Sequence, residues 1–154
     1  MKLKSPSIVQ GHEIPTPFTV NGKDISPKLE WSDVPDGLKE FALIMDDPDA
    51  PSPKPWVHWV IYSIPGNLRE LPEGIARVPE HKGMKQGTNS WPSNNVGYRG
   101  PAPPPGHGTH HYHFKLYALD TNLNLPVSAS KEQVLNAMKG HVLAETELIG
   151  TFKR

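Results

Sequence analysis

Short apolar runs separated by proline-rich turns dominate the hydrophobic pattern of this chain. Runs rich in β-branched and aromatic residues, bounded by proline turns, predict strands at Phe41–Met45, Trp56–Ile64 and His110–Leu119. Alternation of apolar and polar residues predicts a fourth strand in the tail, residues 141–152. Weaker patterns predict further strands at Ser7–Gln10, Leu29–Trp31 and Ile75–Val78.

One segment carries the pattern of an amphipathic helix. Ser130 precedes it and Gln133 follows three residues later, which is a capping box. Val134 and Met138 then mark an apolar face. A shorter helical turn is expected near Asn67–Leu71. With the long proline loops between strands, this order of elements favours a β-sandwich or a mixed sheet with large loops.

Composition places the chain among globular proteins with one core. Its 154 residues suit a single domain, residues 1–154. Lys+Arg and Asp+Glu both number 16, so no net charge favours nucleic acid or an anionic membrane surface. The absence of cysteine excludes disulfides and thiol chemistry. With neither a signal-peptide pattern nor a long apolar stretch, we expect a cytoplasmic protein without a membrane span.

The histidine-rich strand separates its side chains onto two faces. Because alternate residues share a face, His110 and Tyr112 should lie on the core side, with His110 at its rim. His111 and His113 fall on the other face and should be solvated. His107, in the glycine-rich loop before the strand, is left undecided.

The strand at Trp56–Ile64 is apolar on both faces, which predicts a central strand. Trp56, His58, Val60 and Tyr62 should share one face. His58 is then buried or half-buried, and a core imidazole bonded to a backbone carbonyl is one interpretation. A functional interpretation arises because His58 and His110 both stand at the loop-side start of an apolar strand.

An acidic turn follows the strand at Phe41–Met45. Asp46, Asp47 and Asp49 lie within the segment DDPDAPSP, whose prolines stiffen the loop. Asp-Pro turns are ordinary in loops. A rigid loop that carries carboxylates near strand-end histidines is also a common setting for a functional site.

Three chemistries fit these residues. Asp47, His58 and His110 are the ligand types of a zinc or non-haem iron site. Ser52 could act with His58 in a hydrolase, but no nucleophile motif surrounds Ser52, so nothing in the sequence singles it out. An anion pocket fits better: Asp47 would orient histidines that present N–H donors, and backbone N–H groups near Gly100 would add to them. Prolines have no N–H to donate and would form a stiff wall of this pocket; they are Pro101, Pro103, Pro104 and Pro105.

Three stretches together resemble the phosphatidylethanolamine-binding protein (PEBP) family, in particular its bacterial and archaeal Raf-kinase-inhibitor-like branch. They are DDPDAPSP, WVHWVIYSIPG and GYRGPAPPPGHGTHHYHFKLYALD, and the tail GHVLAETELIGTFKR is also similar. The resemblance runs from about residue 7 to the C-terminus. It implies a mainly β fold, in which a large antiparallel sheet packs with a smaller sheet and helices are few and short.

The resemblance also implies a ligand-binding site. Asp47 would orient the site, and His58 and His110 would contact an anion. The remaining residues implied are the lining, wall and rim positions Gly100, Pro101, Tyr112, Trp56, Ala50 and Pro51. No catalytic residue, metal or cofactor is implied.

The expected function is that of a non-enzymatic binding module. It would bind a phosphate or carboxylate group and modulate or inhibit a kinase or serine protease, as the resemblance implies. The likeness to the prokaryotic branch also implies a homodimer. One alternative is a small-molecule hydrolase or isomerase that uses Asp47 with His58 or His110 for proton transfer. Another is protease inhibition through the loop Lys82–Ser93, independent of the pocket.

Overall fold

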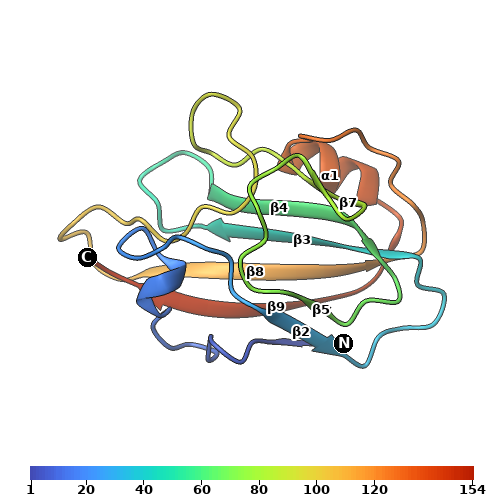
Figure 1. Ribbon diagram of the computed structural model, residues 1–154, viewed down its shortest axis with the longest axis horizontal. Coiled ribbons are helices and arrows are strands. Elements are labelled where there is room, and N and C mark those ends of the chain that lie inside the picture. The colour runs from blue at the N-terminus through green and yellow to red at the C-terminus, as the bar shows by residue number, and fades with distance from the viewer.

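The computed structural model describes residues 1–154, which form two antiparallel sheets (Figure 1). The larger sheet has the order β6-β7-β4-β3-β8-β9 and the smaller sheet has the order β1-β2-β5. The strands of the larger sheet are β3 Glu40–Asp47, β4 Trp56–Pro65, β6 Glu80–His81, β7 Met84–Gln86, β8 His110–Leu119 and β9 Val142–Phe152. Those of the smaller sheet are β1 Lys2–Lys4, β2 Leu29–Ser32 and β5 Glu70–Leu71. The helices are the 3₁₀ helix η1 Thr16–Phe18 and the α-helix α1 Lys131–Met138.

The main core lies between the two sheets. Phe41 of β3 and Phe114 and Leu116 of β8 pack in one cluster with Leu29 and Trp31 of β2. Burial of each such side chain contributes about 1.5–3 kcal/mol to folding. The mainly β fold with a large and a small sheet is therefore confirmed.

Helix α1 covers part of the opposite face of the large sheet (Figure 1). Its Val134 and Met138 pack with Ile44 of β3. The predicted capping box is confirmed: Ser130 Oγ accepts from Gln133 N at 3.1 Å, and Gln133 Oε1 accepts from Ser130 N at 2.9 Å. The helix therefore begins where its sequence predicts.

The edge strand β9 is covered along its C-terminal part by residues from the other end of the chain. Gly11 N donates to Ile149 O at 2.8 Å, and Ile14 N donates to Thr151 O at 2.7 Å. Thr151 N in turn donates to His12 O at 2.9 Å. These bonds satisfy an edge that would otherwise be open to pairing with another chain.

The four long strands and Leu29–Trp31 are confirmed, but two weaker strand predictions are wrong. At Ser7–Gln10 no strand forms, because the Ser5 hydroxyl accepts from the N–H groups of Ser7 and Ile8 and turns the chain. At Ile75–Val78 the backbone bonds elsewhere: Ile75 N donates to Ser26 Oγ at 3.0 Å.

The expected helical turn near Asn67–Leu71 is also wrong. Leu68 N donates to Pro65 O at 3.1 Å and closes a turn there. Glu70 and Leu71 then pair with Glu30 and Leu29 as strand β5. Cross-strand pairing with β2 overrides the local helical preference.

Candidate functional site

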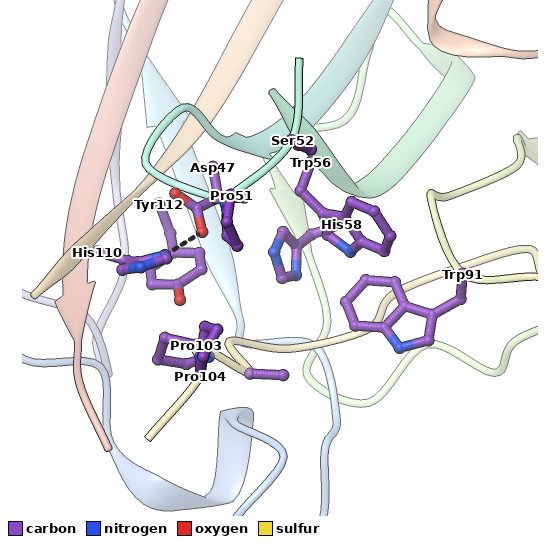
Figure 2. A pocket seen from close by; sticks show the side chains of 12 residues that line it. Asp47, Pro51, Ser52, Trp56, His58, Trp91, Pro103, Pro104, His110 and Tyr112 are labelled. Atoms are coloured by element: carbon purple, nitrogen blue, oxygen red, sulfur yellow. Dashed lines mark hydrogen bonds and ion pairs between the residues drawn. The ribbon is translucent and has the colours of Figure 1, made fainter. Parts of the chain in front are cut away.

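The end of β3 and the starts of β4 and β8 lie together at one end of the large sheet and surround a pocket (Figures 1 and 2). Because β3 runs antiparallel to both β4 and β8, its last residue lies beside the first residues of these neighbours. Asp47 accordingly pairs with Trp56 in the sheet register. The pocket has a volume of about 190 Å³. Its lining residues are Asp47, Ala50, Pro51, Ser52, Trp56, His58, Trp91, Ala102, Pro103, Pro104, His110 and Tyr112.

A buried carboxyl group and two imidazole rings form a hydrogen-bonded chain at this end of the sheet. His110 Nδ1 lies 2.7 Å from Asp47 Oδ2, and both side chains are almost fully buried. His110 Nε2 lies 2.6 Å from Nδ1 of His107. The structure thus includes His107, which was undecided from sequence, and connects the pocket wall to the exposed loop that carries it.

The three aspartates of the acidic turn have three different partners. Asp46 faces the opposite side of the sheet and accepts from Lys131 Nζ at 2.7 Å. Asp47 faces the pocket. Asp49 accepts from the backbone N–H and the ring Nδ1 of His111, both at 2.8 Å. Strand alternation and one turn therefore leave a single carboxyl group for the site.

A bulge in β4 turns His58 toward the pocket. Met45 pairs with Trp59, while the next residue, Asp46, pairs with Val57, so His58 is one residue more than β3 provides. The predicted common face of Trp56, His58, Val60 and Tyr62 is therefore wrong. Val60 and Tyr62 pack in the cluster under α1, whereas Trp59 joins the main core and the His58 ring stands 5.2 Å from that of Tyr112.

His58 is a neutral hydrogen-bond acceptor toward the pocket. Its Nδ1–H donates to the backbone carbonyl of Arg99 at 2.6 Å, which leaves a lone pair on Nε2. Burial lowers the pKa of His58 to about 4, although the bond to Arg99 O and the charge of Asp47 oppose the shift. The ring therefore carries no charge at neutral pH.

Tyr112 brings a hydroxyl group without a partner to the same pocket. The residue is fully buried, and its hydroxyl oxygen makes no hydrogen bond within the protein. Figure 2 shows this oxygen on the side of the ring that faces Pro103. Burial, with the charge of Asp47, raises the pKa of Tyr112, so the hydroxyl stays protonated and is a donor.

Apolar side chains form most of the remaining wall. Trp56 and Trp91 meet edge to face with ring centroids 5.6 Å apart, and Trp91 stands 5.0 Å from the His58 ring. Trp91 and Ala102 were missed from sequence. A large aromatic residue within the polar segment TNSWPSNN was the available signal, because such a ring normally needs a packing partner.

Gly100 and Pro101, for which the resemblance implied lining positions, lie outside the lining of this pocket. The Gly100 N–H is not free for a ligand, because it donates to Asp24 Oδ1 at 2.6 Å. Pro101 is buried, and its carbonyl accepts from Val20 N at 3.0 Å. The other residues that the resemblance implied line the pocket. Pro103 and Pro104 supply part of the expected proline wall, whereas Pro105 is exposed and lies outside the lining.

The other histidines of β8 lie mostly as expected. His111 is exposed, and His113 is half-buried with its Nδ1 at 3.1 Å from Glu147 Oε2. His110 is deeper than the predicted rim position, with 1% of its surface exposed. The structure groups no three His, Asp or Glu side chains in a metal-binding arrangement. No helix is long and apolar enough to cross a membrane.

Comparison with known proteins gives matches over nearly the whole chain. The sequence model described as phosphatidylethanolamine-binding protein matches residues 4–153. A UPF0098 protein of Aquifex aeolicus is 50% identical over 155 residues, which cover 100% of this chain and 89% of the relative.

Two crystal structures share the fold along the full length. E. coli YbcL, described as a new member of the mammalian PEBP family, has a TM-score of 0.89 and 32% identity, covering 99% of this chain and 98% of YbcL. The PEBP homologue CT736 of Chlamydia trachomatis has a TM-score of 0.87 and 36% identity, covering 99% and 96% of the two chains.

Proposed function

The chain belongs to the phosphatidylethanolamine-binding protein family, and from this premise we propose that its pocket binds a small ligand through a phosphate or carboxyl group that carries a proton. The proposed binding residues are Tyr112, His58 and the Asp47–His110 pair. The ligand group would lie between them, and the aromatic and proline walls would contact the rest of the ligand.

The unpartnered hydroxyl of Tyr112 is the observation that carries this proposal. A buried polar group without a hydrogen bond costs about 1–3 kcal/mol, and native proteins contain few of them. Here the donor borders a pocket of about 190 Å³, and the free acceptor His58 Nε2 belongs to a neighbouring wall of that pocket. A ligand oxygen that accepts from Tyr112 would recover this cost.

The charges of the lining favour a ligand that brings a proton. No lysine or arginine lines the pocket, Asp47 is the one acidic residue there, and His58 is neutral at pH 7. A fully ionised phosphate would therefore contact no lysine or arginine of the lining. A protonated phosphate or carboxyl group instead accepts from Tyr112 and donates its O–H to His58 Nε2.

The oxyanion group alone should bind weakly. Hydrogen bonds to charged groups contribute about 1.5–3 kcal/mol each. Association costs at least about 4 kcal/mol in lost freedom, so two or three such bonds give affinity on the order of millimolar. A natural ligand would gain affinity through an apolar portion in contact with Trp56, Trp91 and Pro103.

A titration followed by NMR tests the proposal and its proton requirement. Phosphoethanolamine and inorganic phosphate should shift the ring signals of His58 and Tyr112. The affinity for phosphoethanolamine should rise, by up to about tenfold per pH unit, as the pH falls through the second phosphate pKa of about 6. Acetate tests the carboxylate form in the same way, with His141 as a remote reference signal.

The result that contradicts the proposal is also specific. If neither phosphate compound nor acetate moves the His58 and Tyr112 signals at any pH at which the protein is folded, the pocket is not an oxyanion site. Tighter binding at higher pH would reject the protonated form of the ligand.

Modulation of a kinase or serine protease, by the pocket or by the loop Lys82–Ser93, stays a prediction from the family resemblance. So does the alternative of a hydrolase or isomerase. For the hydrolase, Ser52 is a poor nucleophile, because its hydroxyl donates to Lys54 O at 2.6 Å. Comparing ester and phosphate substrates with wild type and His110→Ala tests the enzymatic alternative.

A further inference from the structure

We propose that His107 competes with the ligand for Nε2 of His110. The His107 ring occupies this atom in the free protein and must leave before a ligand can bond to it. This inference rests on the proposed function of the pocket. It adds to it a specificity-determining residue on the loop between Pro104 and Thr109, outside the pocket lining.

Both ring nitrogens of His110 are occupied in the free protein. Nδ1–H donates to Asp47 Oδ2 at 2.7 Å, so in a neutral ring Nε2 is an acceptor. His107 Nδ1 lies 2.6 Å from this atom, so with a neutral His110 ring we infer that His107 Nδ1 carries the hydrogen of the bond. The two rings stand edge to face with centroids 4.9 Å apart. His110 therefore has no hydrogen-bonding atom free for a ligand until the contact with His107 breaks.

His107 is much less firmly held than the group it covers. His110 is buried on β8, whereas residues 104–109 are all exposed. The turn itself is fixed by Gly106 N, which donates to Arg154 O at 2.9 Å, and by His107 N, which donates to Pro104 O at 3.1 Å. A rotation of the His107 side chain alone breaks the contact, and exposed side chains change rotamer within nanoseconds.

The competitor also selects the kind of group that can replace it. In the inferred tautomer, His107 donates its Nδ1–H to His110 Nε2, 2.6 Å away. A singly protonated phosphate or carboxyl group has one O–H, which it can donate to His110 Nε2 or to His58 Nε2. At His110 it restores the bond that His107 made, whereas an unprotonated anion leaves two acceptors facing each other. Displacement of His107 thus exposes a second acceptor, besides His58 Nε2, that the O–H of the ligand can use.

Removal of the competitor should tighten binding. A net hydrogen bond contributes about 0.5–1.5 kcal/mol, so His107→Ala should bind phosphoethanolamine about fivefold more tightly than wild type. His141→Ala is the matched control, since it removes another exposed histidine, bonded to Asp120 and remote from the pocket. Equal or weaker binding by His107→Ala, with wild-type binding intact, rejects the competitor and leaves the pocket proposal standing.

A second measurement tests the contact without depending on affinity. In ¹⁵N-labelled wild type, scalar coupling across the hydrogen bond should connect His107 Nδ1 with His110 Nε2, and saturating phosphoethanolamine should abolish it. Coupling that persists in the saturated complex overturns the inference, as does its absence from the free protein. If no titrated signal moves in either variant, the pocket proposal fails, and this inference fails with it.

Discussion

At the scale of single residues, the buried tyrosines differ in the state of their hydroxyl groups. Tyr62 donates to Pro126 O and accepts from Ala129 N, and Tyr98 donates to Phe18 O at 2.6 Å. Tyr112 makes no such bond. The three residues are equally buried, yet the hydroxyl of Tyr112 adds no hydrogen bond to the fold, so the stability of the fold does not explain its presence.

Replacement of Tyr112 by Phe should therefore separate stability from binding. Tyr112→Phe should leave the free energy of unfolding unchanged or raise it by up to about 1 kcal/mol, because it removes an unsatisfied polar atom. The same variant should weaken phosphoethanolamine binding about tenfold. Urea denaturation and an NMR titration measure the two effects.

Tyr62→Phe is the matched control for this prediction. It removes a hydroxyl with two partners and should lower the free energy of unfolding by about 1–3 kcal/mol without affecting the ligand. If Tyr112→Phe destabilises as much as this control, its hydroxyl has a structural partner after all.

At the scale of elements, the segment that ends at Gly100 is tied to the N-terminal part of the chain. Asp24 accepts from Gly100 N, and its carboxylate also lies 3.3 Å from Arg99 Nε. Arg99 O in turn accepts from the His58 ring. This segment therefore fixes the tautomer of His58 from behind the pocket, although it does not line it.

Gly100→Ala should consequently act on stability. A Cβ atom at Gly100 would lie 2.2 Å from Phe18 O, which is backbone, so the segment would have to move. We expect a loss of about 3 kcal/mol, measured by urea denaturation. Gly140→Ala, where no atom lies within 4 Å but φ is +79°, should cost about 1 kcal/mol. Equal effects of the two substitutions would contradict the close packing at Gly100.

The elements also show which features can be predicted from sequence. Long strands such as His110–Leu119 were predictable because their apolar pattern is continuous, and α1 because its cap is local. The two-residue strands β5 and β6 were not, since only pairing across the sheet defines them. The bulge at His58 was missed for the same reason: it depends on the register with β3.

The site shows the same division between local and distant information. Asp47, His58 and His110 could be identified because each stands at the end of a strand with a recognisable pattern. Trp91 and the partner of Gly100 could not, because contacts between segments far apart in sequence place them. The contact between His107 and His110 depends on the loop conformation, which no strand pattern fixes.

At the scale of the whole molecule, the buried neutral His58 links stability to pH. Its pKa is about 4 in the folded protein and about 6.5 in an unfolded chain. Between these values the unfolded state binds more protons, so the free energy of unfolding falls as the pH decreases from 6.5 to 4. The full contribution is about 3 kcal/mol, and below pH 4 this residue causes no further loss.

His58→Asn tests this link. The variant should show a smaller loss of stability than wild type between pH 6.5 and 4, as measured by urea denaturation at each pH. His12→Asn, which replaces an exposed histidine, should keep the wild-type dependence. A dependence in His58→Asn as steep as in wild type would show that other groups cause it.

The cover of β9 by residues 11–14 has a consequence for biosynthesis. Residues 11–14 leave the ribosome long before residues 149–151, with which they form backbone bonds. During translation the early segment has no partner, and the C-terminal strand is still within the exit tunnel. Closure of this sheet edge therefore waits until residues 149–151 have left the exit tunnel, and until then the nascent protein must remain soluble with one border of its sheet unfinished.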